Sequence, residues 1–253
     1  MFFPFADTPN PPGISPVTLG LISLNVVVFI IFTVPLSTTA PDINNPWLLE
    51  YLKSIGVDNN AQLHQIWNHL SAYQAFVYQY GYRPAAPSVL TLFSSMFLHG
   101  GLLHLGGNML FLWIFGDNVE HRLGSLRFLL AYLGCGVLAT LFFALFAAGS
   151  NIPLVGASGA ISGVLGAYFV WFPRNKVKTF VFLFPFIMDS IYLPARLVLG
   201  FYILFDNLLP FLFAATGSGG VAHGAHIGGF IGGVILALWK YQPQTPPRAQ
   251  HHV

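Results

Sequence analysis

The stretch VGASGAISGVLGAYFVWF at residues 155–172 contains no charged side chain, and it places Ser158 near its start. A second stretch, VAHGAHIGGFIGGVILALWK at residues 221–240, is charged only at its last residue and places His226 at nearly the same distance from its start. About 20 apolar residues let a helix cross a membrane, and polar side chains at that depth are functional hypotheses by default. The two stretches therefore predict membrane helices that hold a candidate nucleophile and a candidate base at matched depth.

The overall composition predicts a protein that crosses the membrane several times. Of its 253 residues, 55% are hydrophobic and 7% are charged, whereas about 25% of the residues of a soluble domain are charged. The formal net charge of +2 is too small to suggest binding to nucleic acid, and the single cysteine, Cys135, excludes an internal disulfide. We therefore expect the lipid bilayer to surround the chain, with no nucleic-acid partner.

Six segments are apolar enough to be spanning helices, so we predict an all-α membrane protein with a six-helix bundle over residues 17–240. Two of the segments are short or rich in glycine and suit the middle of the bundle, because small residues let membrane helices approach closely. Residues 1–16 are expected to form a short N-terminal tail, and residues 241–253 a disordered C-terminal tail. The six segments are residues 17–36, 102–119, 125–148, 155–172, 193–215 and 221–240.

The region between the first two predicted spans, residues 37–101, is not apolar enough to cross the membrane. It is rich in Trp and Tyr, which favour the headgroup zone, so this first outer loop is expected to be interfacial and partly embedded in the membrane. Residues 47–80 could form an amphipathic helix in the interface or a small subdomain outside the membrane, and both readings stay open. The shorter apolar run Thr179–Met188 is interrupted by Pro185 and is also expected at the interface.

The distribution of Lys and Arg predicts the orientation of the chain. With the N-terminus inside, the inner segments hold seven basic residues near the predicted spans and the outer segments hold two. Cytoplasmic loops are enriched in Lys and Arg, so we expect both termini in the cytoplasm of an integral, multi-pass protein of a bacterial inner membrane. The inner residues are Arg122, Arg127, Arg174, Lys176, Lys178, Lys240 and Arg248, and the outer ones are Lys53 and Arg83.

Four polar side chains from three predicted helices fall in one layer. Counted from the outer ends of their helices, they lie roughly 3–9 Å deep. His104 and Asn108 are four residues apart and share a helix face, from which they could donate to a developing oxyanion. The unpaired N–H groups of the first helical turn at Ser158 favour the same negative charge, and His226 can act as general base. By itself, a G-x-S-G pattern can also be a packing stripe whose serine bonds to a carbonyl one turn earlier.

Three motifs, in this order, resemble the rhomboid family of intramembrane serine proteases. They are HGGLLHLGGN at residues 99–108, GASG at residues 156–159 and AHIGG at residues 225–229. The connecting EHRLG at residues 120–124 resembles the family's turn after its second helix. The resemblance implies a six-helix bundle with a water-filled cavity open to the outer face.

The resemblance also implies roles for individual residues. Ser158 corresponds to the nucleophile and His226 to the general base of a dyad that needs no acid, metal or organic cofactor. Asn108 and His104 correspond to residues that help to form the oxyanion hole, together with the backbone around Ser158 and Gly156. The implied activity is that of an intramembrane serine endopeptidase, which cleaves single-span transmembrane substrates near the outer membrane face.

The sequence departs from the family pattern near the histidine. Ser162 stands four residues after the serine, where some members carry an aromatic ring that stacks on the catalytic histidine. Asp206 in the fifth predicted span could orient His226, although a role in substrate entry or helix pairing suits it better. His99 matches a family position near the cavity mouth.

Two other functions remain open. A rhomboid-like protein without activity could bind membrane clients, although the intact pair of Ser158 and His226 argues against this function. A metal or proton transporter could use His99, His104, His223 and His226. The spacing of His99 and His104 by five residues argues against it, because that spacing does not place both on one helix face.

Overall fold

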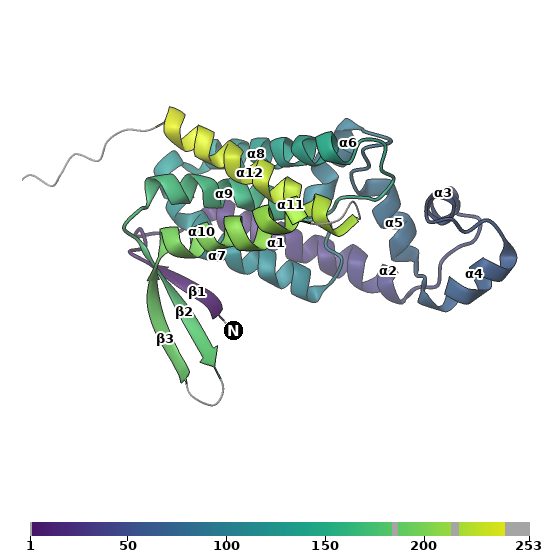
Figure 1. The fold of residues 1–253 in the computed structure, drawn as a ribbon, viewed down its shortest axis with the longest axis horizontal. Coiled ribbons are helices and arrows are strands. Elements are labelled where there is room, and N and C mark those ends of the chain that lie inside the picture. Colours follow the sequence, from purple (N-terminus) through teal and green to yellow (C-terminus); the bar gives the residue numbers. More distant parts are fainter. Residues whose placement is uncertain (1, 184–186, 214–217, 241–253) are drawn as a thin grey trace, which may run out of the picture.

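The computed structural model describes residues 2–183, 187–213 and 218–240, and the predicted tail 241–253 lies outside the described residues. The chain is mostly helical (Figure 1). Its helical elements are α1 (Pro16–Val28), η1 (Phe29–Thr33), α2 (Val34–Thr38), α3 (Pro46–Ser54), α4 (Asn60–Ile66), η2 (Trp67–His69), α5 (Ala72–Tyr80), α6 (Val89–Ser94), η3 (Ser95–Phe97), α7 (Leu102–Leu123), α8 (Ser125–Phe146), α9 (Ser158–Trp171), α10 (Ala195–Ile203), η4 (Leu204–Leu208), α11 (Leu209–Phe213) and α12 (Ser218–Trp239).

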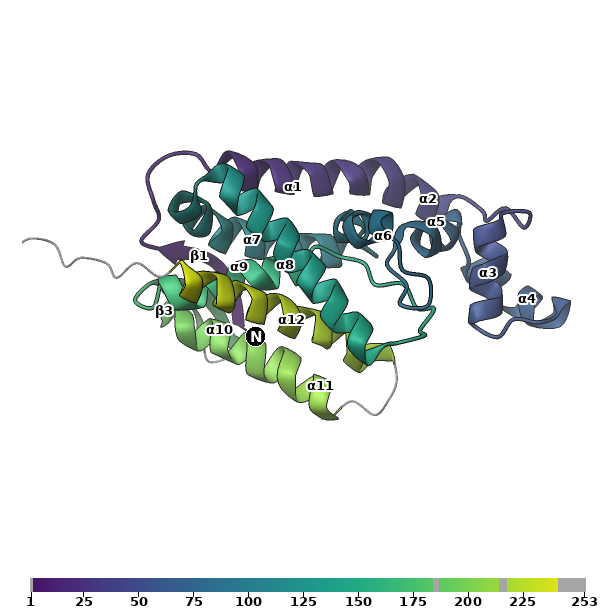
Figure 2. The same cartoon turned by 90° about the horizontal axis from the view of Figure 1, so that it is seen from above.

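The long helices lie side by side in one bundle, with α9 and α12 among the others (Figures 1 and 2). Every residue of α9 from Gly159 to Tyr168 is buried, and α12 packs against both α9 and α8. The largest fully buried side chains include Phe115 of α7, Tyr132 of α8 and Tyr168 of α9. Of the two glycine-rich stretches, α9 therefore takes the interior position that its composition suggested. The stretch in α12 does so only in part, because Ile231, Ile235 and Leu238 are exposed.

All six predicted segments fall on helices, but fewer than six pass as spans by length and hydropathy. Among the described residues three do so alone, and a fourth passes if two helices joined by a 90° bend count as one span. The three are Pro16–Thr38, Ser125–Phe146 and Ala195–Phe213, and the bent pair is Val89–Phe97 with Leu102–Leu123. With 14 residues, α9 is about 21 Å long, shorter than the ~30 Å hydrocarbon core. Because protein surrounds it, α9 need not match that thickness.

A three-stranded antiparallel sheet was not foreseen, and the prediction of an entirely helical chain is wrong there. The strands, in spatial order, are β1 (Phe2–Thr8), β2 (Lys176–Leu183) and β3 (Ile187–Pro194). Part of the predicted N-terminal tail thus becomes a strand, and the run Thr179–Met188 falls on the β2–β3 hairpin, with residues 184–186 outside the described residues. Buried and outward side chains alternate along β2, as a strand requires: Val177 and Val181 are buried, and Lys176 is exposed.

Residues 37–101 contain several short helices, of which α3 and α4 lie beyond one end of the bundle (Figure 1). Leu48, Leu52 and Ala75 form a small buried core of their own. Separate caps start the helices, which favours a small subdomain over one continuous amphipathic helix across residues 47–80. The capping contacts are Asn45 Oδ1 with the Trp47 N–H (2.9 Å), Asn59 Oδ1 with the Gln62 N–H (3.0 Å) and Gln74 Oε1 with the Ser71 N–H (2.7 Å).

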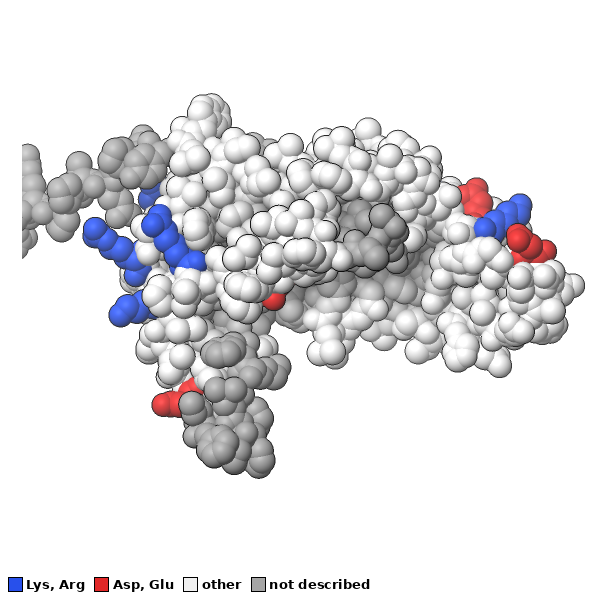
Figure 3. All heavy atoms as spheres, viewed as in Figure 1, with Lys and Arg blue, Asp and Glu red and all other residues white. Residues whose placement is uncertain are grey.

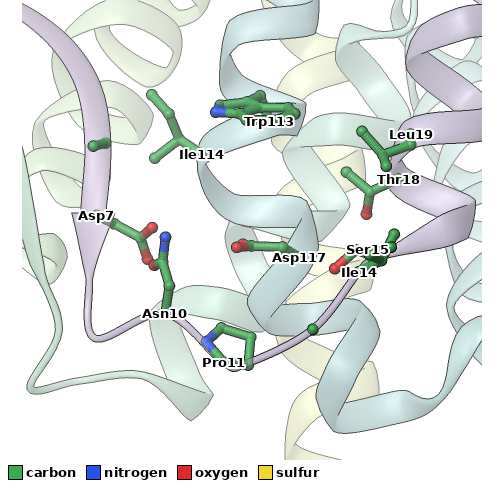
Figure 4. Close-up of a pocket in the computed structure, with 12 residues that line it drawn as sticks. Asp7, Asn10, Pro11, Ile14, Ser15, Thr18, Leu19, Trp113, Ile114 and Asp117 are labelled. Carbon is green, nitrogen blue, oxygen red and sulfur yellow. The ribbon is translucent and has the colours of Figure 1, made fainter.

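The opposite end of the bundle carries most of the basic residues and a cavity with two aspartates among its lining residues. On the face in Figure 3, Lys and Arg gather where the sheet joins the bundle. A cavity of about 360 Å³ lies there between β1, α1 and α7, and Asp7 and Asp117 approach it from different sides (Figure 4). Asp7 accepts hydrogen bonds from the Tyr168 hydroxyl and from Asn118 Nδ2 (2.9 Å). The lining of this cavity includes none of the six residues proposed from the sequence as site residues.

Candidate active site

Ser158 and His226 lie against each other, with 2.7 Å between Ser158 Oγ and His226 Nε2. Ser158 is the first residue of α9, and His226 lies on α12. The two helices meet at glycines: a Cβ added to Gly229 would overlap the carbonyl oxygen of Gly159. Backbones can approach this closely only where side chains are absent, so the glycine pattern of the sequence positions the hydroxyl against the imidazole.

The other ring nitrogen of His226 contacts a residue that the sequence analysis missed. Asn207 Oδ1 lies 2.6 Å from His226 Nδ1 and 3.4 Å from His223 Nδ1. Asn207 belongs to the π-helical segment η4 and is 1% exposed, whereas the neighbouring Asp206 is exposed. The suggestion that Asp206 orients His226 is therefore wrong, because its neighbour makes that contact.

A cavity of about 260 Å³ opens beside the serine and histidine, and His104 and Asn108 from α7 line it with them. Asn108 is 8% exposed, and its Nδ2 has no hydrogen-bond partner in the part of the chain that the structure describes. The amide therefore holds an unpaired donor on a residue of the cavity wall. Apolar walls strengthen the interaction of such a donor with a negative oxygen. The remaining lining residues are Leu103, Gly107, Phe111, Ile161, Leu165 and Tyr202.

Gly156 lies next to His104, in a backbone conformation that favours glycine. Its φ is +123°, and an added Cβ would lie 2.8 Å from His104 Nε2. Its own N–H donates to the Ser95 carbonyl oxygen (2.8 Å), so this N–H is already used and is not a free oxyanion donor. The contribution of Gly156 to the site is the space that it leaves for the imidazole of His104.

His99 lies behind His104 and not at the mouth of the cavity. It is 0% exposed, it does not line the 260 Å³ cavity, and its ring centroid is 5.0 Å from that of His104. The spacing argument that separated the two histidines is wrong because His99 precedes α7, across the 90° bend between η3 and α7. The Tyr73 hydroxyl donates to the His99 carbonyl oxygen (2.7 Å) and ties this turn to α5.

Tyr202 of α10 is a second site residue that the sequence analysis missed. Its ring centroid lies 6.4 Å from that of His226, and its hydroxyl is 2.8 Å from Ser162 Oγ. An aromatic ring therefore does lie near the histidine, although Ser162 stands where some members of the resembled family carry one. A ring supplied by another helix leaves no trace in the spacing around Ser158.

Comparison with known proteins settles the family. The Rhomboid domain family model matches residues 86–243, which is more than half of the chain and contains every site residue described above. The chain belongs to the rhomboid family. Its site is thus built within the region that this rhomboid domain shares with its relatives.

The rhomboid relatives come from bacteria, fungi, plants and mammals. The chain is 36% identical over 146 residues to Rhomboid protease GluP of Bacillus subtilis, covering 58% of this chain and 25% of that protein. It is 34% identical over 128 residues (49% and 36%) to Rhomboid protein 1, mitochondrial, of Saccharomyces cerevisiae. It is 38% identical over 153 residues (58% and 33%) to RHOMBOID-like protein 4 of Arabidopsis thaliana.

The rhomboid chain described here spans about a quarter to a half of the length of the curated relatives that it matches. Several of these relatives are named as mitochondrial. The relatives therefore support an integral, multi-pass membrane protein, but they do not favour the expected bacterial inner membrane over a mitochondrial one.

Proposed function

We propose that this protein is a serine endopeptidase that cleaves transmembrane substrates, with Ser158 as nucleophile and His226 as general base. The observation that carries the proposal is the 2.7 Å contact of Ser158 Oγ with His226 Nε2 beside a cavity of about 260 Å³. A nucleophile and a base within hydrogen-bond reach are the signature of covalent acyl transfer. A protein that only bound membrane clients would have no need of this contact.

The reaction follows from the positions of these groups. Ser158 Oγ attacks the scissile carbonyl carbon while His226 Nε2 takes the hydroxyl proton, and the carbonyl oxygen becomes negative. Asn108 Nδ2 and the first-turn N–H groups of α9 stabilise that charge, with His104 beside them. His226 then returns the proton to the leaving amine, which breaks the peptide bond and leaves an acyl-enzyme. His226 next removes a proton from water, whose oxygen attacks the ester carbonyl. The bond from that carbon to Ser158 Oγ then breaks, and His226 returns the proton to Ser158 Oγ.

The surroundings support a substrate that is itself a membrane helix. Under the proposed topology, six segments cross the bilayer, both termini face the cytoplasm, and the cavity faces the outer side. The cluster of Lys and Arg at the sheet end of the bundle fits an inner face (Figure 3). Because a helical peptide bond is shielded by its own hydrogen bonds, single-span substrates with small residues or proline near the cut are expected.

Labelling with a fluorophosphonate tests this function directly, because the probe reacts with activated serines. We expect wild-type protein in liposomes to be labelled and to cleave a single-span model substrate, and Ser158→Ala and His226→Ala to lose both activities while still folding. Asn108→Ala should slow turnover by about 10²–10³-fold, the loss typical of one oxyanion donor. Folded wild-type protein that neither labels nor cleaves would refute the proposal and favour a catalytically silent binding protein.

A further inference from the structure

We propose that Asn207 is a positioning residue, which holds His226 in the tautomer and ring orientation that it needs as the base for Ser158. The inference rests on the proposed function. It goes beyond that function because it adds a third side chain, from a third helical segment, to a pair that was expected to act alone. Its starting point is the contact of 2.6 Å between Asn207 Oδ1 and His226 Nδ1.

The first step is that the amide of Asn207 has only one orientation that satisfies both of its ends. Its Nδ2 donates to the backbone carbonyl oxygen of Tyr202 (2.8 Å). If the amide were flipped, two oxygens would face each other there, and neither can donate. The amide oxygen is therefore the atom that faces His226.

The second step concerns the proton on the imidazole. Because an amide oxygen can only accept, Nδ1 of His226 must carry the hydrogen in this contact. In the neutral imidazole the other nitrogen, Nε2, then has a free lone pair. That lone pair faces Ser158 Oγ at 2.7 Å, which is the arrangement in which the serine hydroxyl donates and the histidine can take its proton.

The third step explains how Asn207 reaches the site. Residues 202 and 207 are five apart, so in a regular α-helix they would lie about 140° from each other around the axis. The segment η4 directly follows Tyr202 and Ile203 and is a π-helix, whose i→i+5 bonding widens the turn and so changes the direction in which its residues face. The Tyr202 carbonyl oxygen can thus accept from Asn207 Nδ2, and Asn207 turns inward (1% exposed) while Asp206 stays outside.

The fourth step concerns charge. The titratable groups that face His226 are His223 on the same helix, with ring centroids 6.3 Å apart, His104 of α7, and Tyr202 of α10, whose ring centroid lies 6.4 Å away. The carboxylate of Asp206 interacts electrostatically with His223, and not directly with His226. Asn207 adds no charge to this set, so it fixes the direction of the Nδ1–H bond without favouring the imidazolium ion as a carboxylate would.

Nuclear magnetic resonance of protein labelled with ¹⁵N-histidine tests the tautomer in the wild-type protein. The His226 signals are identified by their loss in His226→Ala. We expect neutral His226 to carry its proton on Nδ1. A neutral His226 protonated on Nε2 would overturn the inference, whatever the activity of the protein.

Three variants test the consequence for reactivity, measured as the rate of fluorophosphonate labelling of Ser158 against pH. Asn207→Leu, which has no acceptor, should lower the rate by about 10–10²-fold, the scale of a small misplacement of a reacting group. Asn207→Asp keeps an acceptor, so it should recover most of the rate and move the acidic limb of the profile to higher pH, because a carboxylate favours the protonated imidazole. Asn25→Leu is the matched control: Asn25 is buried in α1 and also bonds a backbone carbonyl of its own helix, Leu21 O (2.8 Å).

The outcomes separate this inference from the proposed function. Wild-type protein that does not label would refute the function itself. If the wild-type protein is labelled and Asn207→Leu is labelled as fast as Asn25→Leu, only the role of Asn207 is refuted. The same holds if the pH profile of the Asn207→Asp labelling rate is not shifted. If Asn207→Leu does not fold, the role of Asn207 is still tested by the pH profile of Asn207→Asp and by the tautomer of His226 in the wild-type protein.

Discussion

Replacing Gly233 by alanine should push α12 away from α9. An added Cβ would overlap the carbonyl oxygen of Gly163, and it would lie 2.7 Å from that carbonyl carbon and 2.9 Å from the Ala167 nitrogen. All three are backbone atoms of a helix at the centre of the bundle, and none can rotate aside as a side chain would. The helices themselves must therefore separate.

The size of the effect follows from these distances. Ordinary contact begins at 3.4 Å, so relieving the 2.7 Å contact with the carbonyl carbon alone takes 0.7 Å, and the closer carbonyl oxygen requires a larger shift. If only the 0.7 Å shift reaches Ser158, its distance to His226 Nε2 grows from 2.7 Å to about 3.4 Å, longer than an ordinary hydrogen bond. Overpacking usually costs about 1–3 kcal/mol, and we expect the upper end because no side chain can absorb the strain. The labelling rate of Ser158 should fall about 10²-fold.

Thermal unfolding in detergent and the labelling rate measure the two effects separately. Gly134→Ala on α8 is the matched control, because a Cβ there meets no described atom within 4 Å. We expect this control to match the wild-type protein in both measurements. Gly233→Ala protein with the stability and reactivity of Gly134→Ala would refute the claim that backbone contact of α9 with α12 positions the pair.

Two further predictions concern the end of the bundle beside the sheet. Glu120 accepts from the backbone N–H groups of Val17 (3.0 Å) and Thr18 (2.7 Å), so Glu120→Gln should cost about 1–3 kcal/mol in a thermal-unfolding assay, while Glu50→Gln, at a largely exposed carboxylate, should cost little. Burial raises the pKa of Asp7 from 3.8 to about 7, although the hydrogen bond from Tyr168 opposes this shift. The folded state then binds the proton more tightly than the unfolded state, so stability should fall as the pH rises from about 4 to about 7, and Asp7→Asn should flatten this dependence when melting temperatures are compared across that range.

Hydropathy was enough to locate the six long apolar helical segments because each is a local stretch of the sequence, but it did not locate the short helices between residues 37 and 101. The sheet was missed for the opposite reason: β1 at the N-terminus pairs with β2, whose register matches Phe3 to Phe180. No local pattern reports such a distant partner. The alternation around Val177 and Thr179 was a usable strand signal, but it was overlooked because the following residues read as an apolar run.

The candidate site divides in the same way. Ser158 and His226 could be proposed from motif spacing and matched depth, because regular helices convert sequence distance into position. Asn207 could not be proposed in this way, because the π-helical segment changes which residue faces inward. Counting along a regular α-helix gave Asp206 instead as a candidate to orient His226. The bend before α7 had the same effect on His99, whose ring meets His104 although the helical count kept them apart.

A buried polar atom without a partner does not by itself mark this site. Among the described residues, Asn25 Oδ1 and the Tyr132 hydroxyl are also buried and unpaired. Asn108 differs because the residue lines the cavity beside Ser158, whereas neither Asn25 nor Tyr132 does. An unpaired donor costs about 1–3 kcal/mol in the free protein, and a charged oxygen forms a bond roughly twice as strong as a neutral one. The gain is therefore largest when the oxygen becomes negative, so the slowing expected of Asn108→Ala is a loss in the transition state and not in folding.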